Sequence, residues 1–205
     1  MTKIKLCGLR GLQDIAYANK VNPDFVGFVF AKSKRQISPQ LAMGMRLALH
    51  KEIVSVGVFV NEQIATICAL VESGTIAMVQ LHGDENEQYI HALKRELSVP
   101  VIKVVSITCK ESLLPYLSSP ADYLLLDAGK GGTGMSFDWS LAQICTRPFF
   151  LAGGLNSENL QKAIATTHPF AVDLSSGLEK GGRKDFSLMQ QAVSIAHRCN
   201  YLSPS

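Results

Sequence analysis

The feature that most constrains the fold is a regular alternation of short apolar runs with longer segments of helical periodicity. Strand-like runs are expected at eight places, 3–7, 25–30, 53–60, 76–82, 101–106, 122–127, 147–154 and 170–176. Helical segments follow them at 12–20, 39–49, 61–73, 86–97, 110–117, from 138, 157–165 and 185–199. Alternation of this kind makes the strands parallel and joins them through crossover helices.

Eight such units spaced about 25 residues apart can close into a (β/α)8 barrel, the TIM barrel. An open doubly wound sheet is the rival fold, but it usually has fewer strands, so the barrel is preferred. No break in composition marks a linker, which predicts a single compact α/β domain over 1–199 with a flexible tail at 200–205. In a barrel of this kind function lies at the carboxyl ends of the strands, and phosphate often binds after strands seven and eight.

Composition and charge exclude several classes of protein. Hydrophobic residues make up 47% and charged residues 18%, which is typical of a globular protein. No apolar run is long enough to span a bilayer and no secretory signal is visible, so a cytoplasmic protein without a membrane partner is expected. The net charge of +3 comes from scattered lysines and arginines and does not suggest a nucleic-acid partner.

Cysteine usage argues against a metal site and against a disulfide framework. The chain has five cysteines and no C-x-x-C pair. Cys68, Cys145 and Cys199 fall in helix-like segments and are expected to be small core residues. Cys7 stands elsewhere, at the end of the first strand.

Two candidate proton-transfer groups stand at strand ends. In the strand 3–7, alternation turns Lys5 and Cys7 towards the barrel interior. The ammonium is expected to lower the pKa of the thiol, which suits Cys7 to act as a base or nucleophile; the alternative is a buried, inert cysteine. Asp127 closes a run of three leucines, and burial would raise its pKa and suit it to be a general acid. The alternative for Asp127 is a cap on the turn that follows.

An acid and a base at strand ends, without a metal cluster, suggest proton shuffling as in an isomerisation. Arg35, after the second strand, offers a bidentate fork for a carboxylate or phosphate, unless it is a solvated loop charge. His82, at the end of the fourth strand, is given a supporting role only.

Glycine-containing turns follow the last two strands. Gly153 and Gly154 allow close approach of a ligand to the backbone, and the helix expected from Ser157 would point N–H groups the same way. Ser176 and Gly177 offer similar donors after the eighth strand. Together they predict a phosphate site, the alternative being ordinary turn glycines.

A third glycine-rich stretch, LLLDAGKGGTG at 124–134, has the spacing G-x-G-x-x-G. We do not interpret it as a dinucleotide site, because its helix is expected only after the motif and the next strand ends without an acid. Its glycines are instead expected to form a short, mobile loop next to Asp127.

Taken together, the strand-end motifs resemble those of the phosphoribosylanthranilate isomerase family of tryptophan biosynthesis. They are KLCGLR, GFVFAKSKR, VGVFVN, VQLHG, LLLDAGKGGTGMSFDW, LAGGLN and VDLSSGLEKGGRKD, in the expected order along the chain. The resemblance implies an aldose–ketose isomerase that performs an Amadori rearrangement of N-(5'-phosphoribosyl)anthranilate without a cofactor or metal.

The same resemblance implies roles for individual residues. Cys7 would be the general base, Asp127 the general acid and Arg35 the partner of the anthranilate carboxylate, with phosphate on backbone amides near Gly154 and Gly177. The protein would act on a small phosphosugar as a monomer or homodimer. Two alternatives stay open: another phosphosugar isomerase or epimerase, and a non-catalytic phosphosugar-binding barrel.

Overall fold

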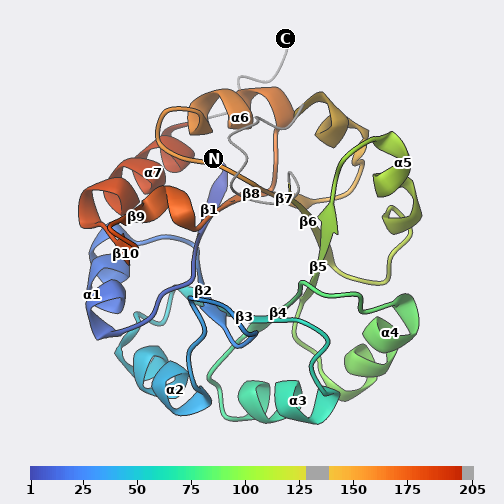
Figure 1. Ribbon diagram of the computed structural model, residues 1–205, viewed down its shortest axis with the longest axis horizontal. Helices are drawn as coiled ribbons and strands as arrows, with labels where there is room; N and C mark the ends of the chain where they lie inside the picture. The colour runs from blue at the N-terminus through green and yellow to red at the C-terminus, as the bar shows by residue number, and fades with distance from the viewer. Residues whose placement is uncertain (128–138, 200–205) are drawn as a thin grey trace.

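The computed structural model describes residues 1–127 and 139–199, and within them eight parallel strands form a closed barrel in chain order (Figure 1). Pairing of β1 with both β2 and β8 closes the ring. The (β/α)8 prediction is therefore confirmed. The strands are β1 (Lys3–Cys7), β2 (Phe25–Val29), β3 (Val54–Phe59), β4 (Met78–Leu81), β5 (Val101–Ser106), β6 (Tyr123–Asp127), β7 (Phe149–Ala152) and β8 (Ala171–Leu174).

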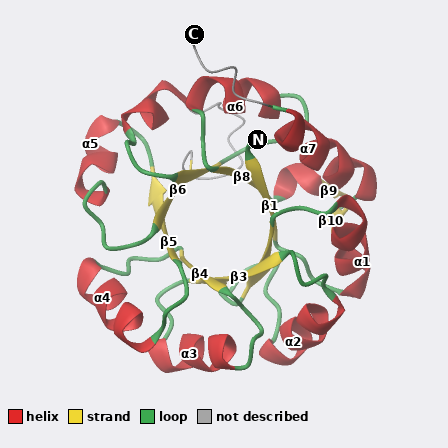
Figure 2. Ribbon diagram, turned by 180° about the vertical axis from the view of Figure 1, so that it is seen from behind, coloured by secondary structure: helices red, strands yellow, loops and turns green. Residues whose placement is uncertain are grey.

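The helices form an outer layer around the strands (Figure 2). They are α1 (Leu12–Val21), α2 (Pro39–Ala48), α3 (Ile64–Glu72), α4 (Glu87–Glu96), α5 (Lys110–Leu113), α6 (Leu160–Thr167) and α7 (Phe186–Arg198). Short 3-10 helices are η1 (Leu114–Tyr116), η2 (Trp139–Ile144) and η3 (Ser176–Leu178). A small antiparallel hairpin of β9 (Glu179–Lys180) and β10 (Arg183–Lys184) follows β8 and was not predicted.

Local sequence explains where two helices begin. Ser38 accepts a hydrogen bond from the N–H of Leu41, with Pro39 in the first turn of α2, and Asn86 caps α4 in the same way. The helix predicted to start at Asn61 instead starts at Ile64. The reason is tertiary: Asn61 has a φ of 51°, and its side chain accepts the N–H of Asp84 in the neighbouring loop instead of capping α3.

Side-chain alternation along the strands divides the core into two layers. In β6, Leu124 and Leu126 join the apolar layer between strands and helices, whereas Leu125 joins the cluster inside the barrel. In β1, Ile4 belongs to the outer layer and Lys5 is fully buried, as the alternation predicted. Cys68, Cys145 and Cys199 are partly buried and pack against the outer layer. Cys68 lies in α3, whereas Cys145 and Cys199 directly follow η2 and α7 and were wrongly expected inside helices.

A buried ion pair ties the loops after β3 and β4 to β5. Lys103 Nζ lies 2.9 Å from Glu85 Oε2, and the two side chains are 3% and 1% exposed. Lys103 also donates to the carbonyl of Gly83, while Glu85 accepts from the N–H groups of Asn61 and Gly83. Burial alone would raise the pKa of Glu85, but these hydrogen bonds outweigh it and hold the pKa below its usual value.

Replacing Glu85 by alanine should lower the free energy of unfolding by about 3–5 kcal/mol, since it leaves Lys103 buried without its counter-charge. Urea titration of both proteins at neutral pH measures the difference. A carboxyl group whose pKa is lowered by folding stabilises the folded protein at pH values above its unfolded pKa. The difference in free energy of unfolding between the unaltered protein and Glu85→Ala should therefore become smaller as the pH falls below the usual pKa range of glutamate.

The matched control is Glu96→Ala, which removes an exposed carboxylate from α4 and should change stability by no more than about 0.5 kcal/mol. A loss below about 1 kcal/mol for Glu85→Ala would show that the pair is not needed to hold these loops.

Candidate active site

A cavity of about 360 Å³ lies at the carboxyl ends of the barrel strands. Its wall includes four residues singled out from the sequence for their side chains, Cys7, Arg35, His82 and Asp127. It also includes Gly153, Gly154 and Ser176 from the two turns expected to hold phosphate. The fold thus brings together groups from strands and loops spread over most of the chain.

Cys7 lies at the end of β1 with 8% of its surface exposed, beside the fully buried Lys5. The predicted lowering of its pKa is wrong: burial raises the pKa of the thiol by more than Lys5 and Lys184 lower it. Part of the reason is Asp173, whose Oδ2 lies 3.0 Å from Lys5 Nζ and whose negative charge also raises the pKa of Cys7. At neutral pH Cys7 is therefore mostly a thiol in the free protein.

Asp127 is the last residue of β6 and lies on the wall of the same cavity as Cys7, three strands from β1 in the closed order, with β7 and β8 between them. Its Oδ2 is 3.9 Å from Nε2 of His82, and its side chain is 27% exposed. Burial lowers the pKa of His82 despite the nearby Asp127, so the imidazole is neutral at neutral pH. The glycines 129, 131 and 134, and the loop predicted for them, lie outside the described residues.

Arg35 is on the cavity wall, but one edge of its guanidinium is already occupied. Its Nε donates to Glu179 Oε1 over 2.6 Å and its Nη2 donates to Glu179 Oε2 over 2.9 Å. Glu179 also accepts from Lys184 Nζ over 3.1 Å. Sequence reasoning missed this pair, although a signal was present: Gly181 and Gly182 between two short charged runs indicate a hairpin.

The glycine turns after β7 and β8 approach each other closely. Gly153 and Gly154 have φ values of 93° and 63°, a region that favours glycine. A Cβ at Gly177 would overlap the carbonyl oxygen of Leu155, so only glycine lets the second turn pack on the first. Gly177 is not among the residues that line the cavity, whereas its neighbours Ser175 and Ser176 are.

The helix predicted to begin at Ser157 begins instead at Leu160. The side-chain oxygen of Asn156 accepts the N–H groups of Glu158 and Asn159, which form a turn ahead of the helix. The N–H groups of Glu158 and Asn159 are thus occupied within the turn, and α6 itself starts three residues later than predicted.

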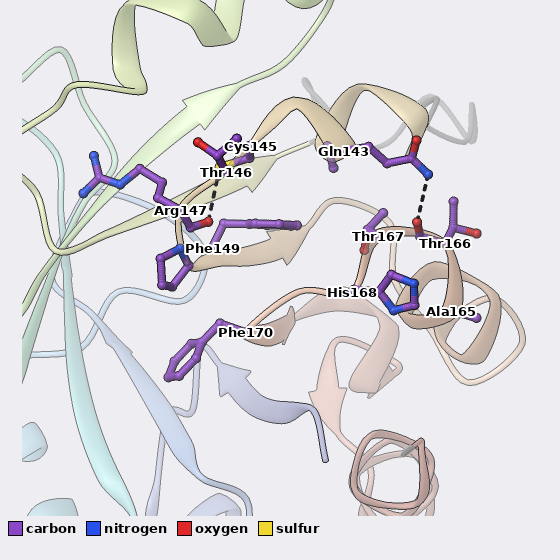
Figure 3. A pocket seen from close by; sticks show the side chains of 12 residues that line it. Gln143, Cys145, Thr146, Arg147, Phe149, Ala165, Thr166, Thr167, His168 and Phe170 are labelled. Atoms are coloured by element: carbon purple, nitrogen blue, oxygen red, sulfur yellow. Dashed lines mark hydrogen bonds between the residues drawn. The ribbon is translucent and has the colours of Figure 1, made fainter. Parts of the chain in front are cut away.

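A larger hollow of about 590 Å³ lies at the amino ends of β7 and β8, away from Cys7 and Asp127 (Figure 3). Its polar side chains are engaged locally: Gln143 donates to the carbonyl of Thr166, and Arg147 donates to that of Ser119. In barrels of this kind the amino-terminal end serves stability and the opposite end serves function. We therefore place the site in the smaller cavity.

Within 1–127 and 139–199, no three histidine, cysteine, aspartate or glutamate side chains cluster in a way that would hold a metal ion. Across the same residues, no helix combines the length and the apolar character that crossing a membrane requires.

The fold and the cavity define the class: this is a (β/α)8-barrel enzyme with its site at the carboxyl ends of the strands. Residues 4–194 match the model of the family described as N-(5'-phosphoribosyl)anthranilate (PRA) isomerase. A relative of that name from Endomicrobium trichonymphae is 44% identical over 199 residues, which covers 95% of this chain and 98% of the relative. The chain belongs to the N-(5'-phosphoribosyl)anthranilate isomerase family.

Solved structures of the family agree. The crystal structure of phosphoribosyl anthranilate isomerase from Thermotoga maritima superimposes with a TM-score of 0.88 at 36% identity, covering 96% of this chain and 99% of that one. A family member in complex with reduced 1-(o-carboxyphenylamino)-1-deoxyribulose 5-phosphate gives a TM-score of 0.85 at 35% identity, with the same coverage. The resemblance inferred from the motifs is confirmed.

The raised pKa of Cys7 predicts how the thiol reacts with iodoacetamide. Because only the thiolate reacts, the alkylation rate of Cys7 should rise about tenfold per pH unit from pH 7 and continue to rise beyond its ordinary pKa of 9.0. Mass spectrometry of the Cys7 peptide after timed quenching measures the rate, with N-acetylcysteine as the reference thiol. A plateau below pH 8 would mean that the lysines outweigh burial after all.

Proposed function

We propose that Cys7 and Asp127 carry out the reaction of this chain's family, the rearrangement of N-(5'-phosphoribosyl)anthranilate to 1-(2-carboxyphenylamino)-1-deoxyribulose 5-phosphate. The observation that supports it is their position on the wall of one cavity, from strands on different sides of the barrel. A substrate held between them would meet a proton donor on one side and a proton acceptor on the other.

The first step belongs to Asp127. Its carboxyl group donates a proton to the ring oxygen of the ribose, the bond between that oxygen and C1 breaks, and the nitrogen lone pair forms an iminium ion. The second step belongs to Cys7, whose thiolate removes the proton from C2 to give an enolamine. The enolamine then tautomerises to the ketone. One proton is given and one is taken, as an isomerisation requires.

The raised pKa of Cys7 fits the order of these steps. A thiolate is scarce at neutral pH in the free enzyme, but it is also a stronger base than one with a low pKa. Opening the ring places a positive iminium next to the sulfur, and a nearby cation favours the ionised thiol. The base would thus become competent when the proton on C2 has become acidic.

The remaining residues would orient the substrate. Arg35 would pair with the anthranilate carboxylate, and the turns at Gly153, Gly154, Ser176 and Gly177 would bind the phosphate through backbone N–H groups. His82, neutral and 3.9 Å from Asp127, would support the acid. The ligand named for the solved family member carries a carboxylate and a phosphate, the same two anionic groups.

We also propose that the enzyme works in the cytoplasm on a small phosphosugar, as a monomer or homodimer, without nucleic-acid or membrane partners. Another phosphosugar isomerase or epimerase, or a barrel that only binds, would give different outcomes in the assay below.

Cys7→Ser and Asp127→Asn should each lower kcat by at least about a hundredfold, since each removes one general acid or base. The assay follows the fluorescence of freshly made phosphoribosylanthranilate as it is consumed. Matched controls are Cys109→Ser and Asp84→Asn, which alter exposed residues of the same types and should keep activity. Absence of turnover by the unaltered protein would refute the activity, whereas full activity in both variants would refute only the assigned roles.

A further inference from the structure

The hairpin of β9 and β10 carries a buried carboxylate, Glu179, that contacts Arg35 on the cavity wall. Glu179 on β9 pairs with Arg35 through two hydrogen bonds, and the two side chains are 7% and 19% exposed. Lys184 on β10 lies opposite Glu179 in the hairpin register, with only 1% of its side chain exposed. Its Nζ donates one hydrogen bond to Glu179 and another to the carbonyl of Ser175. Arg35, Glu179 and Lys184 thus form a cluster of three charged side chains.

The hydrogen bonds with Glu179 use one edge of the Arg35 guanidinium, and the end of the guanidinium is left to meet a ligand. Arginine has five N–H donors in a planar fork, and Glu179 takes the edge formed by Nε and Nη2. The end of the fork, formed by Nη1 and Nη2, has the parallel donors that match a second carboxylate. Arg35 lines the cavity but Glu179 does not, so the carboxylate acts on the arginine and not on a bound ligand.

A second arginine fastens the same hairpin to the loops around it. Arg10, after β1, donates to the carbonyl of Lys34, the residue before Arg35. It also donates to the carbonyl of Gly182 at the tip of the hairpin. Arg10 therefore connects the tip of the hairpin that carries Glu179 to the backbone just before Arg35.

The charges of the cluster also suit a single anion. Burial alone would raise the pKa of Glu179, but hydrogen bonds and charges from Arg35 and Lys184 lower it to about 2, so it is ionised at neutral pH. Burial lowers the pKa of Lys184 by more than Glu179 raises it. When Arg35 and Lys184 are both protonated, the cluster carries one net positive charge. Without Lys184 the pair of Arg35 and Glu179 would be neutral and would attract a carboxylate less strongly.

We propose that Glu179 is a positioning residue that holds Arg35 by one edge so that the other meets the aromatic carboxylate of the substrate, with Lys184 as its counter-ion. This rests on the proposed function, since it deepens the role of Arg35 in it. The hairpin then determines selectivity for a substrate with a carboxylate on its ring, while phosphate is held by other residues.

The test is Glu179→Gln, which keeps the shape of the side chain and removes the charge and one acceptor oxygen. The added net positive charge by itself favours an anion, but Arg35 loses part of the two-bond contact that orients it. The loss of orientation is expected to exceed the charge effect, so KM for phosphoribosylanthranilate should rise at least about tenfold, with kcat changed less than about threefold. In binding titrations, affinity for anthranilate should fall about tenfold while affinity for inorganic phosphate is unchanged. Lys180→Gln, on the same hairpin with its side chain 66% exposed, is the matched control and should change neither.

Glu179→Asp provides a second variant in case the glutamine variant does not fold. It keeps the charge but is too short for both hydrogen bonds, so anthranilate should again weaken while phosphate does not. Equal weakening of both ligands would indicate general damage to the site and would overturn the proposal, as would unchanged affinity for anthranilate. The binding titrations do not depend on turnover. An inactive protein would therefore refute the proposed function, while the titrations with anthranilate and phosphate would still test the role of Glu179.

Discussion

The structure depends on the seam where β1 meets β8 and closes the barrel. Lys5 and Asp173 face each other across it in register, with 3.0 Å between Nζ and the carboxylate, and Lys5 is fully buried. Burial alone would lower the pKa of Lys5, but Asp173 raises it above its usual value, so the ammonium stays charged inside the barrel. Cys7 follows two residues later on the same face, so the pair that closes the seam also sets the electrostatic surroundings of the proposed base.

Around this seam the site is assembled from loops that are distant in the chain. Arg35 follows β2 and meets Glu179 after β8, and the turn at Gly154 meets that at Gly177. The parallel arrangement explains this, because it brings all the carboxyl ends of the strands to one end of the barrel. The groups proposed for proton transfer, Cys7 and Asp127, thus stand on the barrel strands β1 and β6. The groups proposed for ligand binding, Arg35 and the glycine turns, lie in loops, and Arg35 is held by the hairpin of β9 and β10.

Much of this was predictable from local patterns, and two of the errors come from contacts between segments that are distant in the chain. The apolar alternation located every strand of the barrel, and the same alternation turned Lys5 and Cys7 inwards correctly. The pKa of Cys7 was predicted in the wrong direction because the sequence shows a lysine nearby but not the depth of burial or the carboxylate of Asp173. The start of α3 was misplaced because Asn61 bonds to Asp84, in a loop that only the folded chain brings within reach. The start of α6 was misplaced for a local reason, because Asn156 accepts the N–H groups of Glu158 and Asn159 in a turn ahead of the helix.

The sequence by itself determined the fold class, the family and which residue types stand at the strand ends. These properties follow from periodicity and motif, which are local and can be recognised without knowing any contact between distant segments. Only the tertiary structure decided that one edge of Arg35 is held by Glu179, that Lys184 balances this carboxylate, and that Cys7 is a thiol of raised pKa. Burial and charge pairing decide such properties, and both depend on distant partners such as Glu179, which is 144 residues from Arg35 in the chain.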